Sequence, residues 1–460
     1  MNTFHASIGA IAFLAASAVH ASAGVTNESL SLQVSDAASG DFFGAAVAID
    51  GDFLIAGARA DDDFGSSSGS ATVFRRTAPG VWVQEQKLTA SDASGSDQFG
   101  WAVDIDGDLA VVNARRDDVG GTNSGSVYIF RRSAMGVWSQ VDKIGASDPA
   151  QNDEFGSSVS ISNGTVIVGA SNNDDDGSNS GAVYFFAEES PDDWTQLAKV
   201  TAPDAAGGDE FGFGVSIDGD VAAVGAPYSG GFFGSVYIYR QTMPGVWSFE
   251  EEVTTPDARS FGEFGFSVSV SGDTLIVGAP SDDEKDIQSG VAYIFTKGMT
   301  GWEQAALFTP MNPQSGMFFG ESVNIDGGTA VAGGRGGAVG MIMEESPPMS
   351  GMWFNLTDIQ GSDGDGGSSF GDSVSVSNGT VAAGAPLADN SNSVPSGVAH
   401  VFSAPAACVG DCDGSGTVDF NDLIAMLFEF GNSTEACDAD NSGTIDFNDL
   451  ITTLFLFGPC

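Results

Sequence analysis

The sequence predicts an all-β fold: a seven-bladed β-propeller with four strands in each blade, followed by a small α-helical C-terminal domain. The 460 residues include 63 glycines and many Val, Ile and Phe residues, whereas long helical periodicities are missing from most of the chain. Composition changes after residue 403. The strongest observation is a Phe-Gly step that recurs roughly every 55 residues, at Phe43, Phe99, Phe155, Phe211, Phe264, Phe319 and Phe370.

Each repeat can be divided into four strands, and the fourth copy shows the pattern clearly. Its first strand alternates through Val215 and Ile217, which indicates one packed face. The residues at 218–220, Asp-Gly-Asp, are typical of a hairpin turn. The second strand ends at Gly-Ala-Pro (225–227), the third reads Ser-Val-Tyr-Ile-Tyr (235–239), and the fourth begins near Trp247.

The seven repeats contain only six of these tryptophans, because the chain leaves the last repeat after its third strand. The segment at 28–36 aligns with 84–92, the fourth strand of the first repeat. We therefore expect an N-terminal strand to complete the last repeat and close the ring, which leaves no exposed sheet edge. The tryptophans are Trp82, Trp138, Trp194, Trp247, Trp302 and Trp353.

The Phe-Gly and Gly-Ala-Pro steps resemble the FG-GAP repeats of integrin α-subunit propellers and their bacterial relatives, over residues 28–403. Arg59 and Arg115 replace the proline in the first two copies, and the sixth copy reads Gly333-Gly334-Arg335 at this step. WD40 repeats are similar in length, but their Gly-His and Trp-Asp pairs are missing. The resemblance implies a binding or adhesion protein that recognises its ligand on the end carrying the loops between strands two and three. The full signature is found at 225–227, 278–280 and 384–386.

Acidic loops join strands two and three at 60–69, 116–125, 172–181 and 281–290. Strands alternate in direction, so these loops and the connections between repeats should emerge on the same, strongly acidic end. The turn between strands one and two is too short for the calcium loop that integrin-type blades carry there. Two interpretations of the acidic loops stay open. In the first, their Asp residues form turns and cap backbone N–H groups. In the second, some of these residues bind cations weakly or face a cationic ligand, namely Asp61, Asp62, Asp63, Asp174, Asp175 and Asp176. Trp101, Tyr228, Phe232, Arg59 and Arg115 on this end are equally compatible with ligand contact and with packing.

The C-terminal segment 404–460 contains two near-copies, at 411–431 and 438–458, that each begin with an Asp-x-Asp-x-Ser-Gly loop. The spacing matches the liganding positions of a calcium loop, with Gly416 and Gly443 where the loop must turn sharply. Aspartate at the last liganding position and the duplicated loop–helix resemble a dockerin, which implies a cohesin-like partner. The predicted Ca²⁺ ligands are Asp411, Asp413, Ser415, Thr417, Asp419 and Asp422, and Asp438, Asp440, Ser442, Thr444, Asp446 and Asp449.

Residues 1–23 are predicted to be a signal peptide, with an apolar stretch and a small-residue cleavage pattern at 21–23. The mature chain, with the propeller at 24–403, should be secreted and soluble, or held at the cell surface. In that oxidising setting the four cysteines, Cys408, Cys412, Cys437 and Cys460, indicate two disulfides. Of three connectivities, Cys408–Cys412 with Cys437–Cys460 is preferred.

The net charge of −47 argues against nucleic acids and anionic membranes as partners and favours divalent counter-ions. No catalytic residue is predicted: His400 is the one histidine after residue 23, and no Ser-His-Asp set, HExxH motif or nucleophile elbow is found. The sequence therefore predicts a non-enzymatic binding or adhesion protein. Its propeller would recognise an extracellular glycan or protein, and its calcium-dependent tail would anchor or assemble it. An extracellular hydrolase or lyase acting on polysaccharide, and a structural cell-surface scaffold, are the alternatives.

Overall fold

The computed structural model describes residues 30–403, apart from 79, 256–260, 311, 337–339, 346–352, 361–367 and 391–393, together with 417–418 and 458–459. The chain divides into two compact units, and the larger spans Gly24–Ala406. In the other unit, the described residues form two short paired strands, β29 (Thr417–Val418) and β30 (Gly458–Pro459). The predicted signal peptide and the predicted helices of the C-terminal domain lie outside the described residues.

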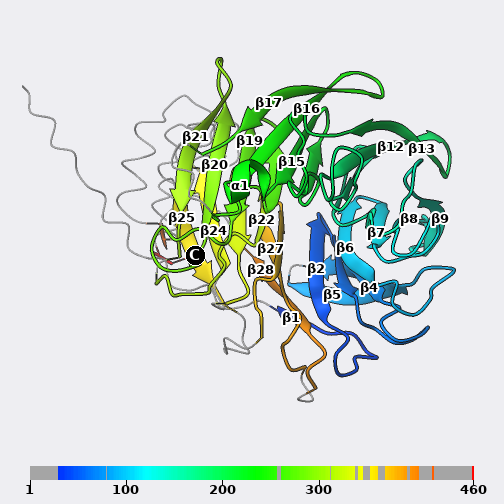
Figure 1. The fold of residues 1–460 in the computed structure, drawn as a ribbon. Helices are drawn as coiled ribbons and strands as arrows, with labels where there is room; N and C mark the ends of the chain where they lie inside the picture. Colours follow the sequence, from blue (N-terminus) through cyan, green and yellow to red (C-terminus); the bar gives the residue numbers. More distant parts are fainter. Residues whose placement is uncertain are drawn as a thin grey trace, which may run out of the picture. The chain divides into compact units, whose positions relative to one another are not determined.

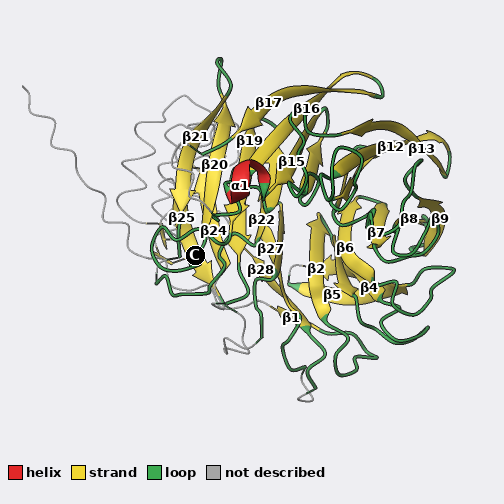
Figure 2. Cartoon of the chain, in the orientation of Figure 1, coloured by secondary structure: helices red, strands yellow, loops and turns green. Residues whose placement is uncertain are grey.

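The larger unit is an all-β propeller built from four-stranded antiparallel blades, as the sequence predicts (Figures 1 and 2). The described residues form seven four-stranded sheets. The first consists of β2 (Phe43–Asp50), β3 (Phe53–Ala58), β4 (Ser70–Ala78) and β5 (Val81–Leu88). The second consists of β6 (Phe99–Asp106), β7 (Leu109–Ala114), β8 (Ser126–Arg132) and β9 (Trp138–Ile144). The third consists of β10 (Val159–Ser162), β11 (Thr165–Ala170), β12 (Ala182–Ser190) and β13 (Asp193–Val200).

The next three sheets follow the same order along the chain. The fourth consists of β14 (Val215–Asp218), β15 (Val221–Ala226), β16 (Ser235–Met243) and β17 (Val246–Val253). The fifth consists of β18 (Ser267–Ser271), β19 (Thr274–Ala279), β20 (Val291–Lys297) and β21 (Trp302–Phe308). The sixth consists of β22 (Ser322–Asp326), β23 (Thr329–Gly333), β24 (Gly340–Glu345) and β25 (Trp353–Ile359). Within the described residues one short helix, α1 (Ser229–Phe232), interrupts this pattern between β15 and β16.

The seventh sheet joins the two ends of the larger unit. It consists of β26 (Ser373–Ser377), β27 (Thr380–Ala385), β28 (Val398–Ser403) and the N-terminal strand β1 (Leu30–Leu32). Strand β1 lies antiparallel beside β28, with Ser31 opposite His400 (Figure 1). The expectation that an N-terminal strand pairs with the last repeat is therefore confirmed.

Backbone-to-side-chain hydrogen bonds link each inner strand to its neighbour. The last residue of an inner strand accepts a hydrogen bond from the turn of the next sheet, as Asp50 Oδ2 does from the Gly107 amide at 2.8 Å. The same bond recurs through Asp106, Ser162, Asp218, Ser271 and Asp326. It then passes from the seventh sheet to the first, because Ser377 Oγ accepts from the Gly51 amide at 3.1 Å. Polar residues at this position therefore hold the sheets to one another.

The two glycines of the repeat signature touch each other between neighbouring sheets. A Cβ atom added to Gly225, in the Gly-Ala-Pro step, would lie 1.9 Å from the carbonyl oxygen of Gly265, in the next Phe-Gly step. No side chain fits in that space, so the two motifs recur together because the sheets pack through them. The second sheet carries Asn113 in place of this glycine, and its side-chain amide donates to the Gly156 carbonyl oxygen instead.

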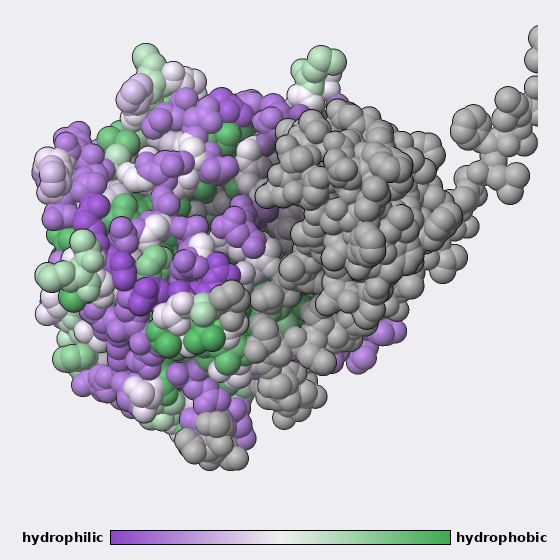
Figure 3. Space-filling view, turned by 180° about the vertical axis from the view of Figure 1, so that it is seen from behind, coloured by the Kyte–Doolittle hydropathy of each residue, from purple (hydrophilic) through white to green (hydrophobic). Residues whose placement is uncertain are grey.

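The phenylalanine of each Phe-Gly step is buried between sheets and anchors the aromatic core. Phe211 is fully buried and lies edge-on to Tyr237, with ring centroids 5.5 Å apart. Phe99 packs in the same way against Tyr128 at 5.4 Å. Seen from behind, by contrast, most of the coloured surface is hydrophilic with small hydrophobic areas (Figure 3). The signature residues are thus structural, and a binding site must be sought in the residues around them.

Candidate functional site at the mouth of the propeller

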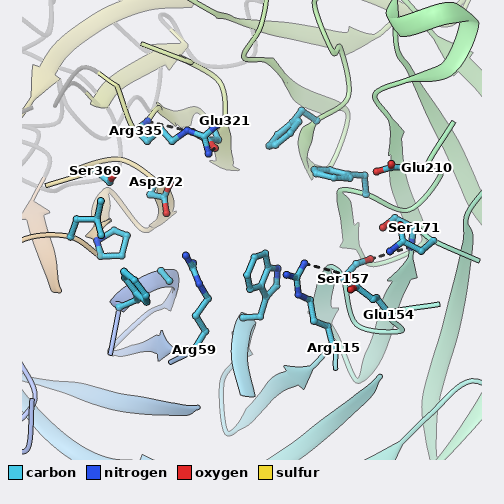
Figure 4. A pocket seen from close by; sticks show the side chains of 18 residues that line it. Arg59, Arg115, Glu154, Ser157, Ser171, Glu210, Glu321, Arg335, Ser369 and Asp372 are labelled. Carbon is cyan, nitrogen blue, oxygen red and sulfur yellow. Dashed lines mark hydrogen bonds and ion pairs between the residues drawn. The ribbon is translucent and has the colours of Figure 1, made fainter. Parts of the chain in front are cut away.

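A pocket lies at the end of the propeller where strands two and three are joined, and most of its lining residues come from three positions of the repeat. They are the residue before Phe-Gly, the residue after Phe-Gly, and the residue after the Gly-Ala step. The pocket has a volume of about 630 Å³ and draws on all seven sheets (Figure 4). Its principal polar and aromatic lining residues are Phe42, Arg59, Trp101, Arg115, Glu154, Glu210, Phe213, Phe266, Glu321, Arg335 and Asp372.

Two arginines lie against one tryptophan on the side formed by the first two sheets. The Cζ atom of Arg115 is 3.2 Å from the centroid of the Trp101 ring, and that of Arg59 is 4.8 Å from it. Arg59 also lies 5.1 Å from the centroid of Phe42. Burial lowers the pKa of both guanidinium groups, that of Arg115 to about 10 against the opposing charge of Glu154. The aromatic rings therefore fix two cations at the pocket wall (Figure 4).

The arginines differ in their partners. Arg115 forms an ion pair with Glu154 at 3.4 Å, and Arg335 forms one with Glu321 at 2.8 Å. Among the described residues, Arg59 has no hydrogen bond or ion pair of this kind, and Asp372 acts on it only at longer range. A half-buried guanidinium presents five N–H donors in a fixed plane. Arg59 thus offers unused donors to the pocket.

Two carboxyl groups of the pocket, those of Glu210 and Glu321, have a raised pKa. Burial, followed by repulsion from Glu154 and Glu263, raises the pKa of Glu210 to about 7. Burial and the neighbouring Asp372 raise the pKa of Glu321 to about 7, although Arg335 opposes the shift. Near neutral pH these two groups can both donate and accept hydrogen bonds. The pocket therefore combines fixed cations, aromatic rings and proton-exchanging carboxyls.

Three of the six aspartates predicted to bind cations weakly form ion pairs with lysines, and the other three take part in hydrogen bonds within their own loops. Lys87 Nζ lies 2.6 Å from both Asp61 and Asp63, and Lys199 pairs with Asp175. Asp62 accepts a hydrogen bond from the backbone amide of Ser67, and Asp174 accepts one from Asn179. Asp176 donates its own backbone amide to Ser180 Oγ. Among the described residues no group of three or more His, Cys, Asp or Glu side chains is arranged to hold a metal ion.

The aspartates two positions before Phe-Gly accept hydrogen bonds from backbone amides of their own loops. Asp41 Oδ2 accepts from the Ala38 amide at 2.7 Å, and Asp97 Oδ2 accepts from Ser94 at 2.8 Å. Asp153 and Asp209 make the same contact. These carboxylates shape the loops that carry the pocket residues.

The predicted tail sites fall largely outside the described residues. Thr417 is the exception, and it pairs with Pro459 across β29 and β30. All the other predicted calcium ligands and the four predicted disulfide cysteines lie outside the described residues. These ligands are Asp411, Asp413, Ser415, Asp419, Asp422, Asp438, Asp440, Ser442, Thr444, Asp446 and Asp449. The cysteines are Cys408, Cys412, Cys437 and Cys460.

Several residues that the sequence places on this end of the propeller line the pocket, although the sequence did not assign them to a site. The structure brings Trp101, Arg59 and Arg115 together, whereas Tyr228 and Phe232 belong to a neighbouring aromatic cluster. Glu210, Glu321 and Asp372 were missed. The available signal was their register, because each directly precedes or follows a Phe-Gly step.

Comparison with known proteins agrees with the repeat structure. A family model described as FG-GAP repeat matches residues 27–74, 82–130, 138–186, 194–239, 247–295 and 353–402, which is more than half of the chain. The repeat between the last two matches is the one that carries Gly333, Gly334 and Arg335 at the Gly-Ala-Pro position. Comparison with curated proteins gave no match. In the part of the chain that the structure describes, no helix has the length and apolar character needed to cross a membrane.

Proposed function

The chain belongs to the FG-GAP repeat family, and we propose that it is a secreted, non-enzymatic binding protein whose pocket at the propeller mouth recognises an extracellular glycan or protein. The observation that carries the proposal is the half-buried Arg59, which lies against Trp101 and has no hydrogen-bond or ion-pair partner among the described residues. A charge kept partly out of water without a close partner weakens a fold. Such groups are typical of sites that a ligand completes.

The test is an array of extracellular matrix proteins and of neutral, acidic and basic glycans, probed with the full chain and with Arg59→Met and Trp101→Ala. We expect binding that both substitutions weaken. Arg76→Met is the matched control, because Arg76 lies over Trp82 at 5.7 Å, is paired with Asp52 and is not part of the pocket. Binding that all three variants retain would contradict the proposal.

A hydrolase or lyase acting on polysaccharide is the second candidate. It is favoured by Glu210 and Glu321, since a pKa of about 7 suits a general acid. Mass spectrometry of bound glycans after incubation separates the two candidates. Unchanged glycans support binding alone, whereas fragments that disappear with Glu210→Gln support catalysis.

We further propose that the tail is a dockerin-like module that binds Ca²⁺ and anchors or assembles the protein through a cohesin-like partner. The support is the spacing of the two Asp-rich loops. Calorimetric titration of the full chain with Ca²⁺ should show two sites, one lost with Asp411→Asn and the other with Asp438→Asn. Self-association on adding Ca²⁺ would favour the structural scaffold, and an unchanged titration in both variants would refute the assignment. Peptide mapping of the secreted protein tests the signal-peptide cleavage and the two disulfides.

We also infer that the seven sheets are the blades of one closed seven-bladed ring. The pairing of β1 with β28 and the hydrogen bond from Gly51 to Ser377 support closure. Deleting residues 24–34 should expose the edge of β28 and lead to aggregation. A deletion variant that stays monomeric and equally stable would contradict closure by this strand.

A further inference from the structure

The loop between β15 and β16 is aromatic where the corresponding loops of four other sheets are acidic. The loops at 60–69, 116–125, 172–181 and 281–290 are rich in Asp, whereas 228–234 reads Tyr-Ser-Gly-Gly-Phe-Phe-Gly. The side chain of Phe232 is 45% exposed, and that of Phe261, from the next connection, is 64% exposed. Neighbouring exposed phenylalanines of this kind mark a contact surface rather than scattered surface apolarity.

The exposed rings continue into the mouth pocket through a series of ring contacts. Phe266 and Phe213, which line the pocket, have centroids 4.5 Å apart. Phe213 lies 6.3 Å from Tyr228, and Tyr228 lies 5.5 Å from Phe232. Phe232 stacks on Phe261 at 5.3 Å with an interplanar angle of 26°. We call the five rings Phe213, Phe266, Tyr228, Phe232 and Phe261 the aromatic platform.

The repeat itself does not require the two exposed rings. The position of Phe232, two residues before the glycine that opens strand three, is occupied by Ser67, Asn123, Asn179 and Gln288 in other sheets. The position of Phe261, three residues before the Phe of Phe-Gly, is occupied by Ser96 and Asn152, and by glycine elsewhere.

The described residues at these positions adopt positive φ, 74° at Phe232 and 71° at Phe261, where Asn and Gly are favoured over bulky residues. The two segments are tied together by a hydrogen bond from the Phe261 amide to the Phe232 carbonyl at 2.9 Å. Phenylalanine at both positions is therefore unfavourable for the backbone and for hydration, and a stable fold does not explain it.

We propose that the aromatic platform binds an uncharged glycan chain that extends from the mouth pocket across the fourth and fifth sheets. This inference rests on the proposed binding function and names the ligand class. Sugar rings present C–H faces to aromatic rings and hydroxyl groups to polar neighbours. The carboxyl groups of Glu210 and Glu263, whose charges both act on Tyr228, supply hydrogen-bonding partners beside the rings.

The charge of the protein decides between ligand classes. A net charge of −47 repels acidic polymers. A basic chain would be attracted to every acidic loop on this end, so it would not depend on the platform. Uncharged sugar rings, in contrast, would bind where aromatic rings are exposed. A ligand without formal charge therefore fits the platform best.

The experiment is affinity electrophoresis of the full chain in gels containing hydroxyethylcellulose, xylan, galactomannan or linear β-glucan, with chitosan as a basic polymer. The test variant combines Phe232→Asn with Phe261→Asn, which installs residues that other sheets carry at these positions and so preserves the fold. Phe64→Asn is the matched control, because Phe64 is 57% exposed in the first acidic loop and lies outside the platform. Trp101→Ala reports on the pocket alone.

We expect at least one uncharged polysaccharide to retard the protein, with about tenfold weaker binding in the double variant and no change in Phe64→Asn. Retardation should persist in roughly 0.5 M NaCl, where attraction between charges is screened. Failure to bind any of the uncharged polymers, equal binding by the double variant, or salt-sensitive binding to chitosan alone would overturn the inference. Binding lost in Trp101→Ala but kept in the double variant would refute the platform and leave the pocket function standing.

Discussion

Lys143→Met should destabilise the second sheet by removing the ammonium group from a partly buried acidic cluster. Lys143 Nζ lies 2.5 Å from Asp117 and 2.6 Å from Asp92, and the Tyr128 hydroxyl lies 2.9 Å from each carboxylate. Asp117 is buried, with 8% of the residue exposed, whereas the Asp92 side chain is 52% exposed. Methionine keeps the packing of the lysine stem but leaves two like charges sharing one hydroxyl.

Removing one partner of a fully buried ion pair costs about 3–5 kcal/mol. Because Asp92 and part of Lys143 reach solvent, which screens the charges, we expect a smaller loss of about 2–3 kcal/mol in the free energy of unfolding. Urea unfolding followed by tryptophan fluorescence measures it. The matched control is Lys285→Met, since Lys285 is 48% exposed, pairs with Glu284 at 3.3 Å and should cost below about 0.5 kcal/mol.

The loss should depend on pH with a defined sign. Although burial opposes the shift, hydrogen bonds from Lys143 and Tyr128 lower the pKa of Asp92 below its ordinary 3.8. Its contribution to stability is therefore present above pH 3.8 and disappears as the pH falls through the lower folded value. The difference in the free energy of unfolding between Lys143→Met and the unaltered protein should be largest at neutral pH and smaller in strong acid. An equal loss in Lys285→Met, or a gap that widens in acid, would refute the reasoning.

Three other substitutions test the scaffold and the pocket. Gly225→Ala should unfold the protein or lower its free energy of unfolding by more than about 3 kcal/mol, because the added Cβ would meet the Gly265 carbonyl. In Gly219→Ala the added Cβ has nothing within 4 Å, so circular-dichroism melts should show a loss of only about 1 kcal/mol. Equal losses in the two variants would contradict the close-contact explanation. Arg59→Met should raise the melting temperature while weakening ligand binding, since it removes a half-buried charge; a lowered melting temperature would indicate a structural role. Glu210→Gln should be more stabilising at pH 8 than at pH 4. Burial first and nearby carboxylates second raise the pKa of Glu210 in the folded protein to about 7, so the stability that the glutamate contributes is lost as the pH rises through that value. A stability difference that is independent of pH would contradict the shift.

The blade architecture could be predicted because each repeat encodes it locally. Phe211-Gly212, the turn at Gly219 and the step at 225–227 lie within one short stretch, and alternation identifies the strands between them. The pairing of β1 with β28 was predictable because a missing fourth strand has to be supplied. The pocket was not predictable in the same way. Glu210 and Arg59 come from different repeats, and only the arrangement of the sheets around the mouth brings them to one cavity.

The acidic loops show a second limit of the sequence pattern. Their Asp content predicts turns and leaves cation sites open as the alternative, because both uses favour the same residues. In the structure Lys87, from the last strand of the first sheet, reaches Asp61 and Asp63 in a loop that precedes it in the chain. The sequence contains this lysine, but the partner becomes evident only when β5 lies beside β4.

The repeat separates the residues that build the propeller from the residues that give it a surface. Gly225 and Gly265 meet in a contact that leaves no room for a side chain, and the one sheet that replaces the first glycine, with Asn113, makes a side-chain hydrogen bond there instead. The positions beside them project into the pocket, where they tolerate alanine, serine, phenylalanine, tryptophan and carboxylates among the repeats. A change of ligand therefore requires substitutions such as Trp101→Ala that leave the sheet contacts intact. For the same reason, the signature that identifies the family carries no information about what an individual member binds, and the flanking residues do.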